Sequence, residues 1–132
     1  QRKKKMKIII DGYNLMYRVR FKGVTLEQKR EEMMDMIKEF LALNPNDVTV
    51  VFDASRSISN HRGHQRFGEI KAVFSGPGES ADDIIEEMIR NRTGKAREHM
   101  VVSSDNRLIK YALEHHFKTM TSDEFAEYLE QE

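Results

Sequence analysis

Cysteine is absent from this sequence of 132 residues, which excludes a disulfide scaffold and thiolate metal sites and agrees best with a reducing cytoplasm. No apolar run approaches the roughly 20 residues that a membrane-spanning helix needs, and no signal-peptide pattern is present. Charge of one sign is not in excess either, because 22 basic residues balance 22 acidic ones. We therefore expect a soluble, cytoplasmic protein with no membrane partner.

The length indicates one domain with a hydrophobic core, since two ordinary domains need a longer chain. We expect residues 1–5 to be a basic tail and residues 6–132 to be the domain. The first residue is Gln1 rather than methionine, which leaves open whether the chain is a fragment of a larger protein. Basic residues gather at 2–7, 18–22 and 56–71, and such local basic regions beside acidic ones can bind a polyanion without a net charge.

Short β-branched runs that end in acidic residues organise the sequence. The run Lys7–Ile10 is followed by Asp11, and two similar runs are followed by Asp53 and Asp105. A fourth run, Ile70–Phe74, leads through a glycine-rich turn to three further acids, which are Glu79, Asp82 and Asp83. Such runs are typical of buried parallel strands, and ligands of open α/β sheets bind at the carboxyl ends of the strands. We therefore predict that these acids converge at one functional centre.

Amphipathic helical segments alternate with these strands. Capping-box patterns mark helix starts at Thr25 and Thr121, and apolar residues recur at helical spacing over 80–92 and 106–116. Residues 117–120 are predicted to form a short edge strand. Strands alternating with helices imply a parallel sheet with helices on both faces.

The stretch from Ala54 to Gly68 has no apolar periodicity, and we predict a loop there. It contains Arg56, Arg62 and Arg66 and no acidic residue. One interpretation is a solvated connection. We prefer a second interpretation, an arm that contacts phosphates, because arginine supplies much of the affinity for nucleic-acid backbones.

Several carboxylates at one edge of a sheet favour a bound cation. At about 5 Å two carboxylates repel by roughly 3 kcal/mol at an effective dielectric constant near 20. A hard divalent ion, Mg²⁺ or Mn²⁺, relieves this repulsion and can activate water for attack on a phosphodiester. The alternative is that Asp11, Asp53 and Asp105 merely cap turns or helices.

The motifs resemble the YacP-like branch of the NYN domain family, within the PIN-like superfamily of metal-dependent ribonucleases. The matching stretches are IIIDGYNLM at 8–16, VVFDA at 50–54, VFSGPGESADDIIE at 73–86 and VVSSDNRLIKYA at 101–112. The resemblance covers nearly the whole domain. It implies a PIN-like three-layer α/β/α sandwich with a mainly parallel sheet of four to five strands, and endonucleolytic cleavage of RNA with Mg²⁺ or Mn²⁺.

Carried over residue by residue, the resemblance makes Asp11, Asp82 and Asp105 the metal ligands. Further members of the implied site are Asn14, orienting Asp11 or a bound water, the additional acid Asp53, and the supporting residues Glu79, Asp83 and Ser104. Ser104 is placed to bond a phosphate or ligand water, or to cap the helix that follows it. From the loop interpretation, Arg56, Arg62 and Arg66 would contact the RNA backbone.

RNA is the expected partner, and the sequence leaves open whether the ribosome or another RNA–protein complex presents it. The oligomeric state, the RNA target and the number of metal ions also stay open. Two rival hypotheses stand beside the nuclease: an inactive RNA-binding or protein-binding module with the same fold, and a small-molecule phosphohydrolase. Tyr13 argues against an aspartyl-nucleophile phosphatase, which normally has a second acid two residues after the first.

Overall fold

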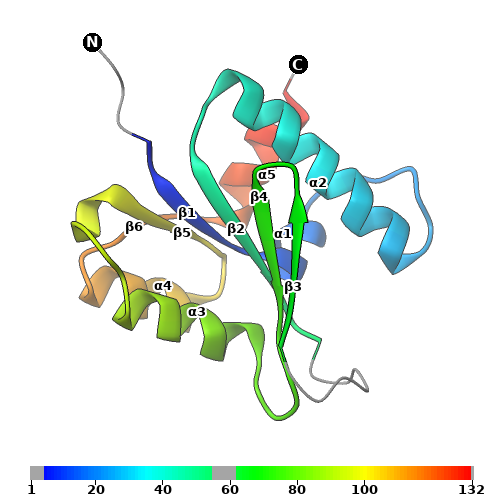
Figure 1. Ribbon diagram of the computed structural model, residues 1–132. Coiled ribbons are helices and arrows are strands. Elements are labelled where there is room, and N and C mark those ends of the chain that lie inside the picture. The colour runs from blue at the N-terminus through cyan, green and yellow to red at the C-terminus, as the bar shows by residue number, and fades with distance from the viewer. Residues whose placement is uncertain (1–4, 55–61, 132) are drawn as a thin grey trace.

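We describe a computed structural model that places residues 5–54 and 62–131 (Figure 1). Most of the predicted basic tail, together with Arg56, lies outside these described residues.

A six-stranded sheet in the order β3-β4-β2-β1-β5-β6 forms the centre of the molecule. All neighbouring strands are parallel except β3 and β4, which form an antiparallel pair. The strands are β1 (Lys7–Asp11), β2 (Asp47–Phe52), β3 (Gly63–Phe67), β4 (Ile70–Phe74), β5 (His99–Val102) and β6 (Lys118–Met120).

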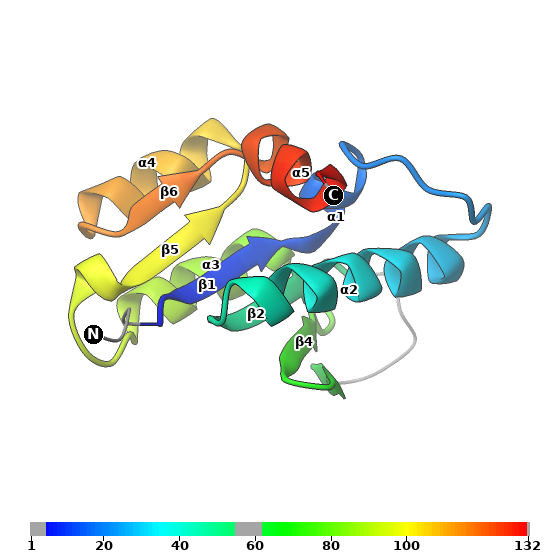
Figure 2. The ribbon, with the colours of Figure 1, turned by 90° about the horizontal axis from the view of Figure 1, so that it is seen from above.

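Helices cover both faces of this sheet, as Figure 1 shows. They are α1 (Gly12–Met16), α2 (Leu26–Leu43), α3 (Ala81–Arg90), the 3₁₀ turn η1 (Ala96–Glu98), α4 (Asn106–Glu114) and α5 (Ser122–Glu130). Helices α3 and α4 lie on one face, whereas α1, α2 and α5 lie on the other. In the view from above, α5 lies against α1 (Figure 2). The predicted three-layer α/β/α architecture and the mainly parallel sheet are confirmed.

Alternation along β1 divides the core into two clusters. Ile8 and Ile10 pack with the core of α1, α2 and α5, whereas Ile9 packs with the core of α3 and α4. Successive side chains of a strand point to opposite faces, so a central strand covered on both faces is apolar throughout. This is why the run before Asp11 contains three consecutive isoleucines.

The sheet has one strand more than expected, because the predicted loop from Ala54 to Gly68 is wrong for residues 63–67. These residues form β3 at the edge of the sheet, paired with β4. The strand is largely exposed, so it needs no apolar alternation, and the sequence therefore gave no strand signal. The expected edge strand at 117–120 is confirmed as β6.

Side-chain caps fix the starts of three helices. The two predicted capping boxes, Thr25 with Gln28 and Thr121 with Glu124, are both present. A third box joins Ser80 to Asp83 at the start of α3. Helices α3 and α4 end at Arg90 and Glu114, two residues earlier than predicted. In the described part of the chain, no helix is long and apolar enough to cross a membrane.

Gly12 is needed where β1 turns into α1, because a Cβ atom there would lie 2.5 Å from the Phe52 ring and 2.9 Å from the Val51 carbonyl oxygen. We predict that Gly12→Ala lowers the free energy of unfolding by about 1 to 3 kcal/mol through this overpacking. Urea denaturation measures the loss. Gly63→Ala is the matched control, because among the described residues its Cβ would meet only Phe74, at 3.5 Å. Equal stability of the two variants would contradict the prediction.

Candidate active site

Three parallel strands deliver acidic residues to one edge of the sheet. Ile10 of β1 pairs with Val50 of β2 on one side and with Val102 of β5 on the other. The strands therefore end at nearly the same level. Asp11 is the last residue of β1, Asp53 follows β2, and Asp105 follows β5 by three residues.

A small hollow of about 240 Å³ lies at this edge. Asp11, Asn14, Asp53 and Asp82 line it, together with the aromatic rings of Tyr13 and Tyr17 and the first residues of α3. Asp105 does not line the hollow, but its charge acts on both Asp11 and Asp82. The structure thus brings Asp11, Asp53 and Asp82 to one hollow, with Asp105 close enough for its charge to act on two of them, whereas Glu79 and Asp83 do not line it.

Asp11 is the most buried of these acids, with 8% of its surface exposed. Burial raises the pKa of Asp11 to about 6, against a hydrogen bond from Ser103 that lowers it, and the charges of Asp82 and Asp105 raise it further. Loss of hydration disfavours the charged form, and like charges add to that effect. The edge therefore holds a negative charge that folding alone does not compensate.

Asp82 reaches the hollow from the first turn of α3. Burial is the largest cause that raises the pKa of Asp82. The charges of Asp105 and Glu86 raise it further, whereas the charge of Arg107 lowers it. Two acids on different elements thus show the same perturbation. Carboxylates whose pKa values are raised by burial and by nearby like charges are typical of functional sites.

Asp105 has two roles, because it is also the N-cap of α4. Its Oδ1 accepts a hydrogen bond of 3.1 Å from the Leu108 amide. The capping interpretation that the sequence left open is therefore correct for Asp105, and it does not remove the carboxylate from the electrostatic field of Asp11.

Ser103 connects two of the acids, and sequence reasoning missed it. Its hydroxyl donates a hydrogen bond of 3.0 Å to Oδ2 of Asp11 and accepts one of 3.1 Å from the Asp105 amide. Ser103 is completely buried, so this bond takes place without competing water. Its position directly after a buried strand, in the SSD segment, was the available signal.

Asn14 and Ser104 lie at a junction behind the hollow. Oδ1 of Asn14 accepts hydrogen bonds from the Ser104 amide, at 2.9 Å, and from the Ser122 hydroxyl, at 2.7 Å. The Ser104 hydroxyl accepts from the Ser122 amide at 3.0 Å. Within the described chain no hydrogen bond joins Asn14 to Asp11, so Asn14 ties α1 to the starts of α4 and α5 instead of orienting Asp11 directly.

Asp53 and Asp83 occupy different surroundings. Asp53 is exposed beside the hollow, and the Ser75 hydroxyl donates to its Oδ1 at 3.5 Å. Asp83 accepts a hydrogen bond of 2.9 Å from the Ser80 amide. Its carboxylate therefore caps α3, which is the role that acids in a first helical turn often have.

Arg62 and Glu79 form an ion-pair network and are not part of an open arm. The guanidinium of Arg62 donates to both carboxylate oxygens of Glu79, at 2.7 and 2.8 Å, and to both of Glu87, each at 3.0 Å. Glu79 also accepts from the Gly76 amide at 2.8 Å. Arg62 therefore fastens the turn before α3 to the helix itself, and so helps to place Asp82.

Arg66 lies at the opposite end of the sheet. It pairs with Lys71 in the β3–β4 ladder, near the amino end of β4, whereas Asp11 lies at the carboxyl end of β1. The three loop arginines were predicted to act together. The structure separates Arg62 from Arg66, and Arg56 lies outside the described residues.

The donor set at the hollow fits a hard divalent cation, because carboxylate oxygens are the ligands that Mg²⁺ and Mn²⁺ prefer. Among the described residues, no three carboxylate or imidazole side chains already surround one point closely enough to hold a metal ion. Mg²⁺ does not require such a cage, since proteins usually bind it through one or two carboxylates, waters and substrate phosphates. Asp11 and Asp82 line the hollow together and are suited to that open form of site.

The mainly parallel α/β/α sandwich with acids at its carboxyl edge has the PIN-like fold, a nuclease-type fold. The chain belongs to the YacP-like NYN domain family, whose profile matches residues 8–132.

Two crystal structures of Rae1 (YacP) from Bacillus subtilis are similar to this chain. The first carries a tryptophan-to-leucine substitution. It has a TM-score of 0.75 and 22% sequence identity, over 95% of this chain and 75% of that one. The second has a TM-score of 0.66 and 20% identity, over 93% of this chain and 72% of that one. A search of curated proteins gives no significant match.

The raised pKa of Asp11 predicts a pH-dependent cost in stability. The folded protein keeps the Asp11 proton up to about pH 6, whereas the unfolded chain releases it near the ordinary value of 3.8. The stability of the wild type therefore falls between about pH 4 and pH 6 and stays lower above that range. We predict that Asp11→Asn, measured with a chelator present, is more stable than the wild type by up to about 3 kcal/mol above pH 6 and equal to it below pH 4.

Urea denaturation from about pH 4 to pH 8 tests this prediction. Asp35→Asn, at an exposed position of α2, is the matched control and should show no such pH-dependent gain. A stability difference for Asp11→Asn that does not change with pH would contradict the assignment.

The ion-pair network of Arg62 leads to a second prediction, which concerns the pKa of Glu79 and is independent of Asp11. Hydrogen bonds from Arg62 are the main reason why the pKa of Glu79 is lowered to about 2. In Arg62→Met we expect the Glu79 pKa to rise toward its ordinary value of 4.5, as measured by carboxyl-carbon NMR. Arg66→Met should leave the Glu79 titration unchanged. A Glu79 pKa that stays near its wild-type value in Arg62→Met would show that another group holds this carboxylate.

Proposed function

We propose that this protein is a metal-dependent endoribonuclease that hydrolyses RNA phosphodiester bonds at the carboxyl edge of its sheet. One observation carries the proposal: Asp11 and Asp82, from different elements, line one hollow, and the charge of Asp105 acts on both. Membership of a family with a nuclease-type fold supports it.

Asp11 and Asp82 would hold Mg²⁺ or Mn²⁺, with Asp105 adding negative charge beside them. When bound, such an ion supplies Lewis-acid stabilisation of the phosphoryl oxygens and lowers the pKa of a coordinated water. Ser103 keeps the Asp11 carboxylate in one orientation through its 3.0 Å hydrogen bond. The Ser80–Asp83 box fixes the start of α3 and so the backbone position from which Asp82 projects.

Aromatic side chains at the hollow favour a nucleic acid over a small phosphate ester. Tyr17 lines the hollow and has 79% of its surface exposed. Unpaired RNA bases are commonly stacked on such exposed rings. A ring that lies beside the acids and has no core to pack against is well suited to hold the base next to the scissile phosphate. Tyr13 lines the same hollow, packed against Phe52.

Neighbouring acids in α3 provide a matched pair of variants. We predict that Asp82→Asn reduces Mn²⁺-dependent cleavage of a single-stranded RNA by at least about 100-fold, because a metal ion contributes several kcal/mol to catalysis. RNA affinity measured with a chelator should stay nearly unchanged, and Asp11→Asn should behave alike. Asp83→Asn should retain cleavage, since asparagine also serves in helix capping.

Undiminished cleavage by both Asp82→Asn and Asp11→Asn would overturn the assignment. A wild-type protein that binds RNA without cleaving it in Mg²⁺ or Mn²⁺ would instead be a binding module. Turnover of a generic phosphate ester without RNA cleavage would identify a small-molecule phosphohydrolase.

A further inference from the structure

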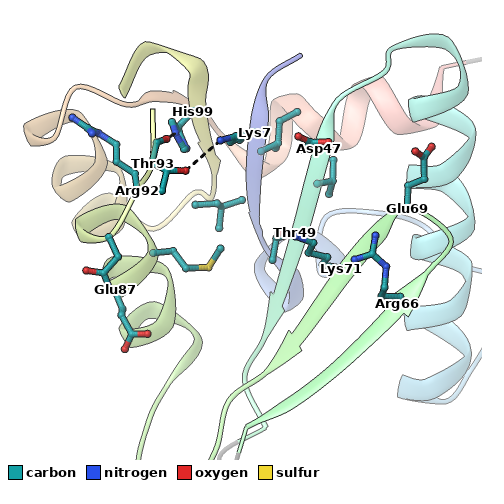
Figure 3. A pocket seen from close by; sticks show the side chains of 15 residues that line it. Lys7, Asp47, Thr49, Arg66, Glu69, Lys71, Glu87, Arg92, Thr93 and His99 are labelled. Carbon is teal, nitrogen blue, oxygen red and sulfur yellow. Dashed lines mark hydrogen bonds between the residues drawn. The ribbon is translucent and has the colours of Figure 1, made fainter. Parts of the chain in front are cut away.

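A second hollow lies at the other end of the sheet from Asp11 and Asp82. It is a groove of about 650 Å³ between α3 and the strands β1, β2, β4 and β3 (Figure 3). The groove exists because α3 and α4 do not extend over the β4–β3 side of this face, as Figure 1 shows. Part of the sheet is therefore open to solvent beside α3.

Four cationic side chains line this groove. They are Lys7, Arg66, Lys71 and Arg92. Three acids also line it, Asp47, Glu69 and Glu87, and Glu87 is already bound by Arg62. In the described part of the chain, none of the four cations forms an ion pair with a carboxylate. Their charge is therefore available to a ligand.

The position of two of the cations is unfavourable without such a ligand. Arg66 and Lys71 are direct partners in the antiparallel β3–β4 ladder. Directly opposite residues have Cβ atoms about 4.5 to 5.5 Å apart on one face, and like charges there destabilise the sheet. Thr49 of β2 is the partner of Lys71 on its other side. Arg66, Lys71 and Thr49 therefore form a row across three strands, in which Thr49 is neutral and can form hydrogen bonds. An anion bound along this row would remove the repulsion.

The two remaining cations donate hydrogen bonds to neutral groups. Nζ of Lys7 donates a hydrogen bond of 3.5 Å to the Thr93 hydroxyl, and Nη1 of Arg92 donates one of 3.1 Å to the Gly94 carbonyl. These bonds position the side chains without neutralising them. In Figure 3, Lys7 projects from β1, Lys71 from β4 and Arg66 from β3, while Arg92 lies just after the end of α3.

We propose that this groove binds the phosphate backbone of an RNA strand, as a contact surface separate from the acidic hollow. Unpaired cations beside Thr49 and Thr93 match a chain of phosphates and hydroxyls, and an open groove admits a strand that continues in both directions. The inference rests on the proposed function for the choice of RNA as the polyanion. Lys7 and Asp11 are four residues apart on β1, about 13 Å, so one strand of RNA can contact both edges.

The test compares the wild type with Arg66→Gln/Lys71→Gln, both in the presence of a chelator. Fluorescence anisotropy of a labelled single-stranded RNA of about 20 nucleotides measures Kd at several salt concentrations between about 50 and 200 mM. Losing two phosphate contacts should weaken binding at low salt and reduce the slope of log K against log salt by about 1.4, at about 0.7 per contact. Lys7→Gln/Arg92→Gln, on the other side of the groove, should have the same effect, and thermal unfolding checks that both variants fold.

Lys110→Gln/Lys118→Gln is the matched control, because it removes the same charge from exposed positions of α4 and β6. The inference is overturned if both groove variants keep the wild-type Kd and slope, or if the control variant loses as much. It is also overturned if an acidic peptide competes for the groove more strongly than RNA of equal charge. If RNA is not cleaved in Mn²⁺ but the slope changes as expected, the proposed nuclease activity is wrong and the proposal that the groove binds RNA stands.

Discussion

Parallel pairing of β1 with β2 and with β5 is the constraint on which the site depends. The first pairing aligns residues about 40 positions apart in the chain, such as Ile10 with Val50, and the second aligns residues about 90 positions apart, such as Ile10 with Val102. Since parallel strands end at the same edge, the residues that follow them gather there. A slip of one residue would turn every side chain of β1, Asp11 included, to the opposite face, so the position of Asp11 depends on this register.

This arrangement concentrates negative charge where water is scarce. The most buried acid, Asp11, loses hydration and faces two further carboxylates. Ser103 offsets part of the cost by donating a hydrogen bond to it, and a cation would offset more. The protein thus retains an electrostatic cost at one edge of the sheet, a cost typical of sites built for a ligand and not needed for folding.

The two ends of the sheet carry opposite electrostatic character. Carboxylates meet at the carboxyl end, whereas the groove at the amino end has four lysine and arginine side chains, beside three acids, that form no ion pair within the described part of the chain. The Arg62 network lies between them and holds α3 to β3 and the preceding turn. Helix α3 therefore takes part in both regions: its first turn supplies Asp82, and the residues after its end supply Arg92.

The sequence by itself determined the layers, the buried parallel strands and the acids that follow these strands, because periodicity and strand-end residues are local properties that can be recognised without knowledge of contacts. It also identified Asp105 as a possible helix cap, a local interaction. Only the tertiary structure decided that β3 is a strand, since an exposed edge strand needs a partner and no apolar pattern. The hydrogen bonds of Ser103 to Asp11, of Ser104 to Asn14 and of Arg62 to Glu79 were likewise decided by folding, because each joins residues at least 17 positions apart.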